Sequence, residues 1–124
     1  MKCRHLSAVL VASAVLTFAG LTGVSAHPKL VSAEPAVGGT VKAAPNQITL
    51  RFNERLEVSF SKVTIRNSEG KQVDNGDAKL DRSDRRILRV SVPTLPPGLY
   101  KVEWQAMSAD THKIEGDFTF SVGP

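Results

Sequence analysis

A nine-residue stretch near the end of the chain decides the fold: residues 98–106 run Gly98-Leu99-Tyr100-Lys101-Val102-Glu103-Trp104-Gln105-Ala106. Every second side chain from Tyr100 onward is apolar, which is the pattern of a strand with one buried face. Trp104 is predicted to belong to the core, because a tryptophan in a strand has a large apolar ring to bury. The stretch therefore predicts a sheet with one face in a hydrophobic core.

The same alternation of apolar and polar residues recurs in shorter segments along the chain. The predicted strands are residues 30–31, 48–52, 60–66, 79–80, 88–92, 100–106 and 118–122. Proline, glycine and asparagine residues separate these segments, and no window shows a helical period. About seven short strands predict one all-β domain, a sandwich with Greek-key connections, with a small closed barrel as the alternative.

The first 26 residues predict a secretory signal peptide. Lys2 and Arg4 precede an apolar segment, and small residues ending in Ala26 follow it, in the order that signal peptides show. Cleavage there leaves one domain, residues 27–124, whereas an uncleaved anchor helix is the alternative. We therefore expect an exported, periplasmic protein.

Composition limits the partners and the chemistry of this domain. Removal of residues 1–26 lowers the formal net charge from +4 to +2, with both signs interspersed. The densest basic run, residues 82–89, is interrupted by Asp84, so nucleic acid is not an expected partner. The one cysteine, Cys3, is removed with the signal peptide, which excludes a disulfide and a copper thiolate from the mature domain. We expect a monomer.

His27 is the first residue of the predicted mature chain. It then carries a free α-amine beside its imidazole, and these two nitrogens can close a six-membered chelate ring on a metal ion. The next residue, Pro28, has no backbone N–H, so a metal cannot recruit a deprotonated amide there. His27 therefore predicts half of a metal site that is completed by processing.

The mature chain has a second histidine, His112, two residues after Asp110. If this segment is extended, residues i and i+2 point to the same side, and the carboxylate and the imidazole converge. With His27 they supply three nitrogens and one oxygen, a donor set typical of tetragonal Cu(II). Asp110 could instead cap a turn and His112 could lie exposed, and Met107 is predicted to pack rather than to bind a metal.

Six segments of the chain together carry a family resemblance. They are His27-Pro28-Lys29-Leu30, Ala33-Glu34-Pro35-Ala36, Ile48-Thr49-Leu50-Arg51-Phe52-Asn53-Glu54, Gly98-Leu99-Tyr100-Lys101-Val102-Glu103-Trp104, Ser108-Ala109-Asp110-Thr111-His112, and Gly116 with Phe118-Thr119-Phe120-Ser121-Val122. With these segments the mature chain resembles the CopC family of periplasmic copper-resistance proteins over nearly its whole length. The strand residues are generic, whereas the terminal His-Pro combined with a late tryptophan and Ser-x-Asp-x-His is specific.

The resemblance implies an immunoglobulin-like β-sandwich or barrel that carries one Cu(II) ion. By position, His27 would supply its amine and imidazole, Asp110 an oxygen and His112 the third nitrogen. Glu54 matches a carboxylate near the copper in this family and is expected as an outer or axial group. Some members also bind Cu(I) in a loop rich in methionine and histidine. Residues 57–87 contain neither residue type, so no Cu(I) site is expected here.

The expected function is binding of one Cu(II) ion in the periplasm for copper resistance or homeostasis, by sequestration or delivery. The resemblance implies an inner-membrane CopD-type copper transport protein as a partner. Two alternatives belong to other classes, a histidine-brace copper oxygenase and a metal-free immunoglobulin-like interaction module. Asp110 would fill a coordination position that an oxygen-activating centre keeps open, and the domain is small for a polysaccharide-binding surface. No enzymatic activity is therefore expected.

Overall fold

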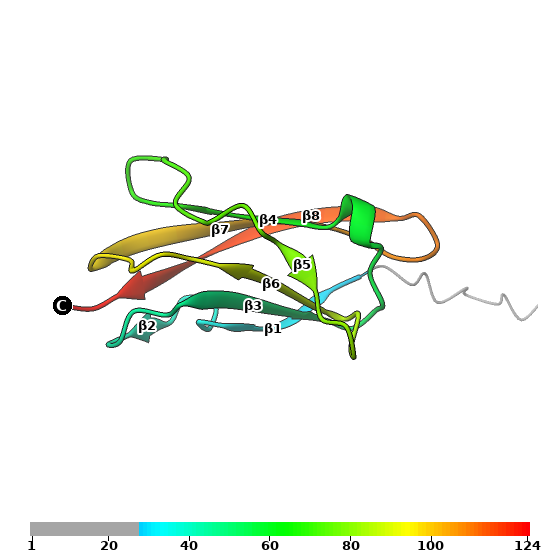
Figure 1. Ribbon diagram of the computed structural model, residues 1–124, viewed down its shortest axis with the longest axis horizontal. Helices are drawn as coiled ribbons and strands as arrows, with labels where there is room; N and C mark the ends of the chain where they lie inside the picture. Colours follow the sequence, from blue (N-terminus) through cyan, green and yellow to red (C-terminus); the bar gives the residue numbers. More distant parts are fainter. Residues whose placement is uncertain (1–27) are drawn as a thin grey trace, which may run out of the picture.

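The computed structural model describes residues 28–124, which form two β-sheets packed face to face (Figure 1). The strands are β1 (Leu30–Glu34), β2 (Thr40–Val41), β3 (Gln47–Phe52), β4 (Lys62–Arg66), β5 (Lys79–Leu80), β6 (Ile87–Ser91), β7 (Gly98–Met107) and β8 (Lys113–Val122). A short 3-10 helix, η1 (Val58–Phe60), precedes β4. In this part of the chain no helix has the length and apolar character needed to cross a lipid bilayer.

The two sheets have the strand orders β1-β3-β6-β5 and β2-β8-β7-β4. Paired strands run antiparallel, except that β2 and β8 are parallel. The chain changes sheet at every connection except β5–β6 and β7–β8, as in the Greek-key connections of immunoglobulin-like sandwiches. The predicted all-β immunoglobulin-like fold is confirmed, with two separate sheets rather than a closed barrel.

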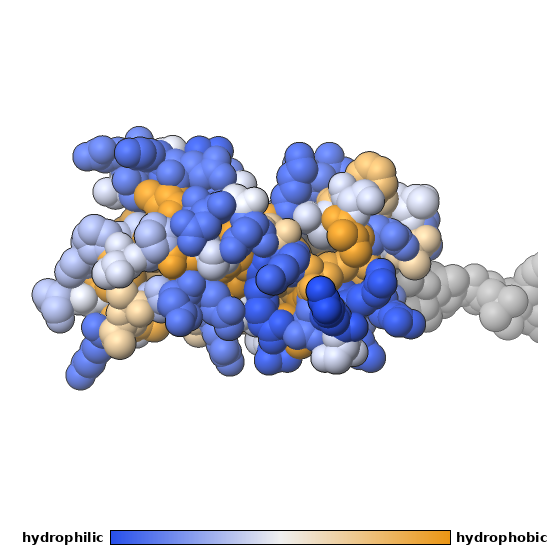
Figure 2. Space-filling view, viewed as in Figure 1, coloured by the Kyte–Doolittle hydropathy of each residue, from blue (hydrophilic) through white to orange (hydrophobic). Residues whose placement is uncertain are grey.

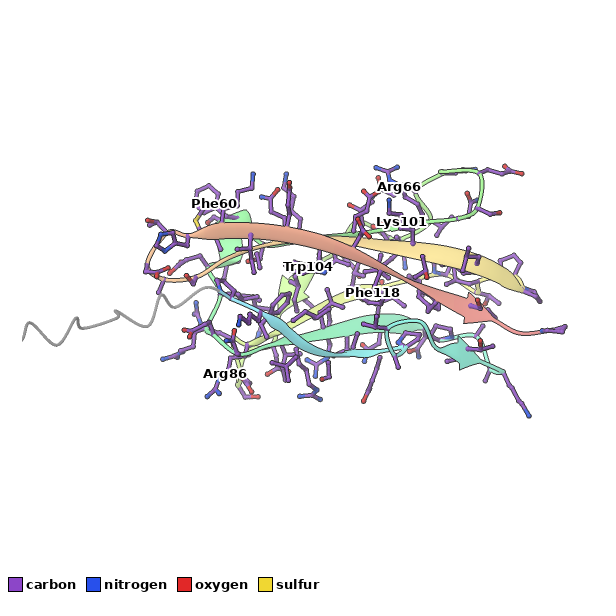
Figure 3. The ribbon with its side chains drawn as sticks, turned by 180° about the vertical axis from the view of Figure 1, so that it is seen from behind. Phe60, Arg66, Arg86, Lys101, Trp104 and Phe118 are labelled. Carbon is purple, nitrogen blue, oxygen red and sulfur yellow. The ribbon has the colours of Figure 1, made fainter. Side chains whose placement is uncertain are left out.

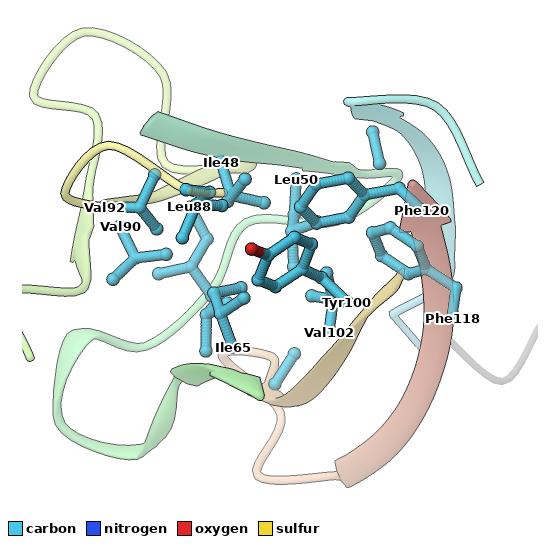
Figure 4. Packing of buried hydrophobic residues seen from close by; sticks show 14 of the residues in the cluster. Ile48, Leu50, Ile65, Leu88, Val90, Val92, Tyr100, Val102, Phe118 and Phe120 are labelled. Carbon is cyan, nitrogen blue, oxygen red and sulfur yellow. The ribbon is translucent and has the colours of Figure 1, made fainter. Parts of the chain in front are cut away.

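The core lies between the sheets and is built from the alternating residues of their inner faces (Figure 4). Its fully buried members include Leu50 from β3, Ile65 from β4 and Val102 from β7. Burial of such a side chain contributes about 1.5–3 kcal/mol to folding. Tyr100 stacks on Phe120 with ring centroids 5.5 Å apart, and it closes the core at the end of the sandwich where β7 begins.

The hydroxyl of Tyr100 donates a hydrogen bond to the backbone carbonyl of Pro96 over 2.5 Å. This contact back to a residue just upstream resembles the tyrosine corner of immunoglobulin-like domains. Burial raises the pKa of the Tyr100 phenol above its ordinary value. The phenol therefore stays protonated and acts as the donor in this contact.

Trp104 packs against the core, as its place in the alternation predicts. Its ring meets Phe52 edge to face, with centroids 5.1 Å apart and an interplanar angle of 72°, and Figure 3 shows it between the two layers. On the neighbouring strand β8, a Cβ at Gly116 would lie 2.5 Å from Cζ2 of Trp104. Gly116 is therefore a glycine because the indole occupies the space of a side chain.

The strands differ from the predictions at several points. The strand β1 runs to Glu34 rather than ending at residue 31. The strand β8 begins at Lys113 rather than at residue 118, because a glycine flanked by acidic residues resembles a turn in the sequence. The strand β4 begins at Lys62 rather than at residue 60, because Phe60 ends η1 with 51% of its surface exposed. The two-residue strand β2 was too short to produce an alternation.

The β7–β8 loop, the β5–β6 loop and the start of β1 lie at one end of the sandwich, away from the C-terminus (Figure 1). Figure 3 shows Phe60 and Arg86 at this same end, on opposite layers. A short segment connects the layers there, since the N–H of Leu56 donates to the carbonyl of Arg85 (3.0 Å) and that of Glu57 to the carbonyl of Met107 (2.8 Å). Hydrophilic side chains cover most of the face in Figure 2, with apolar areas small and separated.

Candidate metal centre

Residues 108–112 form the turn that joins β7 to β8. The N–H of Ser108 donates to the carbonyl of His112 over 3.3 Å, and the N–H of Thr111 donates to the carbonyl of Ser108 over 3.0 Å. Thr111 has a φ of 71°, in the left-handed region that reverses the chain direction. The expectation that this segment is extended is therefore wrong, because the chain turns back on itself here.

The turn nevertheless brings the two predicted ligands together. Oδ2 of Asp110 lies 3.1 Å from Nδ1 of His112, and Oδ1 accepts the backbone N–H of His112 over 3.3 Å. The hydroxyl of Ser108 also donates to Oδ1. Asp110 thus holds the turn and contacts the imidazole with the same carboxylate, so the turn-capping alternative and the convergence with His112 are both realised.

These hydrogen bonds fix the charge of the carboxylate. The Ser108 hydroxyl first, then the side chain and the backbone N–H of His112, lower the pKa of Asp110 to about 2. The carboxylate is therefore ionised at neutral pH and can only accept hydrogen bonds. In the neutral ring of His112, Nδ1 must then carry the proton and Nε2 the lone pair, which is the form of histidine that binds a metal.

Two modes of metal binding are compatible with this geometry. Asp110 can offer a carboxylate oxygen as a ligand, or it can orient the imidazole from outside while His112 binds through Nε2, as carboxylates beside metal-binding histidines commonly do. The side chains of His112 and Asp110 are 57% and 42% exposed. An ion can therefore reach either group from solvent without a rearrangement of the core.

His27, the third predicted ligand, lies outside the described residues, as does the predicted signal peptide. Its neighbour Pro28 is fully buried, and the N–H of Lys29 donates to Oδ1 of Asn53 over 2.6 Å. Within residues 28–124 no group of three or more histidine, cysteine, aspartate or glutamate side chains could hold a metal ion. The described part of the chain thus supplies two donors, Asp110 and His112.

Two further residues of interest lie at this end of the sandwich. Glu54 is half-buried in the bend that follows β3, at the end of the sandwich that carries the turn. Met107 is half-buried at the end of β7, and its backbone carbonyl accepts a hydrogen bond from the N–H of Glu57. A ligand role of Glu54 stays a prediction, and so does the absence of a Cu(I) site.

Sequence patterns assigned no role to Ser108 or Asn53. Ser108 is 2% exposed, and an isolated β-bridge to Leu56 holds it in place, so its hydroxyl reaches Asp110 from a fixed position. A serine two residues before an aspartate is a common turn signal, which could have identified this contact. Nothing local to Asn53 indicates that its side chain reaches Lys29, 24 residues away.

Comparison with known proteins decides the family. The family model of the CopC domain matches residues 30–123. The chain belongs to the CopC family. Copper resistance protein C of Pseudomonas syringae pv. tomato is 41% identical over 103 residues, which cover 78% of this chain and 81% of that protein. The crystal structure of CopC from Methylosinus trichosporium OB3b has a TM-score of 0.74 at 37% identity, over 79% of this chain and 95% of that one.

A further relative is much longer than this CopC-family chain. Copper transport protein CutJ of Bacillus subtilis (strain 168) is 34% identical over 99 residues, and these cover 79% of this chain but only 18% of CutJ. Membership in the CopC family identifies a copper-binding copper resistance protein rather than an enzyme, and proteins of this family are typically periplasmic. The oxygenase and the metal-free interaction module are therefore not supported.

Proposed function

We propose that this chain, after removal of residues 1–26, binds one Cu(II) ion in the periplasm. The ligands are the α-amine and imidazole of His27, an oxygen of Asp110 and a ring nitrogen of His112. The observation that supports this site most directly is the 3.1 Å contact between the Asp110 carboxylate and the His112 imidazole. It lies at the end of the sandwich where the chain enters β1 (Figure 1).

Each ligand has a distinct role in this proposal. His27 forms the chelate and ties the ion to the processed terminus, while His112 adds an imidazole from the β7–β8 turn. The ionised Asp110 supplies the oxygen ligand and lowers the positive charge of the site. This set of nitrogen and oxygen donors favours Cu(II), whereas Cu(I) prefers sulfur ligands. Reduction of the ion therefore weakens its retention and supplies a step for delivery.

The recipient of the copper belongs to the proposal as well. CutJ, whose name describes a copper transport protein, matches this chain over a small part of its own length. CutJ therefore contains a segment similar to this chain within a longer protein that is named for copper transport. We therefore propose that this chain, as a separate monomer, delivers copper to an inner-membrane transport protein of the CopD type.

The direct test is titration of Cu(II) into the chain that begins at His27, followed by native mass spectrometry and electron paramagnetic resonance. We expect saturable uptake of one ion and a tetragonal spectrum with nitrogen couplings. A matched chain with an acetylated α-amine should bind much more weakly, because acetylation removes one donor and leaves every side chain in place.

The same preparation separates the proposed site from adventitious binding. His27→Ala retains the terminal amine but loses the imidazole, and it should lose the wild-type spectrum. Equal affinities for the free, acetylated and His27→Ala chains would show that copper binds elsewhere. Mass spectrometry of the exported protein would also establish whether cleavage follows Ala26.

A further inference from the structure

We infer that Asn53 is a positioning residue that holds the start of the mature chain where its first residue can reach the β7–β8 turn. This inference rests on the proposed Cu(II) site. Asn53 contacts neither Asp110 nor His112 among the described hydrogen bonds. It acts through Lys29, two residues after the proposed ligand His27.

The contact between Asn53 and Lys29 is reciprocal. The backbone N–H of Lys29 donates to the side-chain Oδ1 of Asn53 over 2.6 Å, and the backbone N–H of Asn53 donates to the carbonyl of Lys29 over 3.0 Å. Both polar groups of the Lys29 backbone are therefore bound to one residue. The side-chain oxygen of Asn53 thus accepts the Lys29 N–H in the place where a backbone carbonyl would accept it in a regular ladder.

The two hydrogen bonds between Lys29 and Asn53 extend the β1–β3 ladder by one residue pair beyond Leu30 and Phe52. Leu30 lies opposite Phe52 in that ladder, and a bulge follows before Ser32. Upstream of Lys29, the buried Pro28 offers no N–H to the sheet. Pro28 and Lys29, the two residues that follow the proposed ligand His27 in the sequence, are thus both held at this end of the sandwich.

The residues that follow Asn53 hold the other half of the proposed site. Three positions later, Leu56 forms a β-bridge to Ser108, and Ser108 donates to the Asp110 carboxylate. One short segment, residues 53–57, thus contacts the chain at Lys29 and the turn that carries Asp110. This segment therefore links the Lys29 end of β1 to the turn that carries Asp110.

Removal of the Asn53 amide should therefore weaken copper binding without removal of a donor. A free N-terminal segment must lose conformational freedom when it joins the ion, whereas a fixed one has lost that freedom already. One hydrogen bond of this kind corresponds to a roughly three- to tenfold change in an equilibrium constant. We expect a loss of that size in Cu(II) affinity.

The test compares three variants of the chain that begins at His27 by competition with a Cu(II) chelator. Asn53→Ala should bind roughly three- to tenfold more weakly than the wild type. Asn53→Asp retains the acceptor oxygen and should restore most of the affinity. Asn75→Ala is the matched control, because Asn75 also makes a side-chain hydrogen bond, to Oγ of Ser91 over 2.8 Å, at the opposite end of β6. It should bind as the wild type does.

A double-mutant cycle with His27→Ala distinguishes positioning from general destabilisation. If Asn53 acts through the terminus, Asn53→Ala should cause no further loss in an N-acetylated His27→Ala chain, which has neither the amine nor the imidazole of residue 27. Equal losses in both backgrounds, or wild-type affinity of Asn53→Ala at temperatures where thermal unfolding shows it folded, would overturn the inference while the Cu(II) site stands. Failure of His27→Ala to change binding at all would overturn both.

Discussion

Two loops at the same end of the sandwich are each organised by one aspartate, yet only one of them belongs to the proposed metal site. In the β5–β6 loop, Oδ1 of Asp81 accepts the N–H and hydroxyl of Ser83, over 2.8 and 2.6 Å, and the N–H of Asp84 over 2.9 Å. Its other oxygen binds the guanidinium of Arg89. The carboxylate is thus enclosed by donors from its own loop and from β6.

The β7–β8 turn uses the same plan with a different final partner. Asp110 accepts a serine hydroxyl and a nearby backbone N–H through one oxygen and contacts the His112 ring through the other. In both loops the serine hydroxyl makes the largest contribution to a lowered carboxylate pKa. The loops differ in whether the second partner is arginine or histidine.

That difference decides which loop offers a nitrogen lone pair. Arginine stays protonated and offers only donors, so Arg89 stabilises its loop but has no lone pair for an ion. Imidazole retains one lone pair when its other nitrogen donates to a carboxylate. The histidine in place of an arginine is therefore what makes the β7–β8 turn a candidate for metal binding, and the predictions below test this contrast.

The largest expected effect is the loss of copper binding in His112→Ala. Replacement of groups outside the coordination shell commonly costs roughly 10–100-fold in metal affinity, so loss of a ligand should cost at least about 100-fold. Arg89→Ala is the matched change in the other loop and should leave copper affinity unaltered. Chelator competition measures both variants. Equal copper affinities for the two would remove the distinction between the loops.

The next effect concerns stability rather than copper. Gly116→Ala puts a Cβ 2.5 Å from the Trp104 ring, and overpacking of this kind destabilises proteins by about 1–3 kcal/mol. Gly123→Ala is the control, because its nearest neighbour would be 3.5 Å away, the carbonyl of Val41. Urea unfolding compares them. Copper affinity of folded Gly116→Ala should match the wild type, so a large loss would mean that the site depends on sheet packing as well as on its turn.

A smaller effect is expected from the two serines. Ser108→Ala removes a hydroxyl from a residue that is 2% exposed, which should lower stability by about 1 kcal/mol and copper affinity by up to roughly tenfold. Ser83→Ala alters the exposed β5–β6 loop and should leave copper affinity unchanged. Calorimetry and chelator competition measure these quantities. A loss of copper affinity in Ser83→Ala would show that the loops are coupled.

The smallest effect is expected on the free energy of unfolding at low pH, and it concerns Asp81. The pKa of Asp81 is held below its ordinary value of 3.8, mainly by Ser83 and Arg89. Its contribution is therefore complete above about pH 4 and is lost as pH falls through the lower native pKa. Asp81→Asn should be less stable than the wild type at pH 7, and the difference between the two should shrink as the pH falls from 4 to 2 in urea unfolding of the metal-free proteins. A difference that stays constant down to pH 2 would contradict this origin.

Much of the fold follows from residue alternation, because a strand with one buried face reveals its period in the sequence. Tyr100 and Val102 are buried as their spacing requires. The first half of β8 was not predictable in this way, since the reason for Gly116 is the Trp104 ring on the neighbouring strand. Short-range patterns cannot show such a cross-strand contact before the register is known.

The closeness of Asp110 and His112 was predictable from the sequence, and the way in which the chain produces it was not. The spacing of Asp110 and His112 indicated convergence, but the turn at Thr111 produces it rather than an extended strand. The role of Asn53 depends on where the β1–β3 ladder ends and on the bulge after Leu30. A bulge shifts register by one residue, so no local pattern could place the Asn53 side chain at Lys29.

Trp104 is the only tryptophan in the chain, and its position makes it an internal optical probe. Its indole lies between Phe52 and Gly116, and four residues further on β7 gives way to the turn at Ser108. The fluorescence of the protein therefore comes from one packed environment beside the proposed metal site. Folding, and quenching by a paramagnetic ion bound at that turn, can be followed without a label.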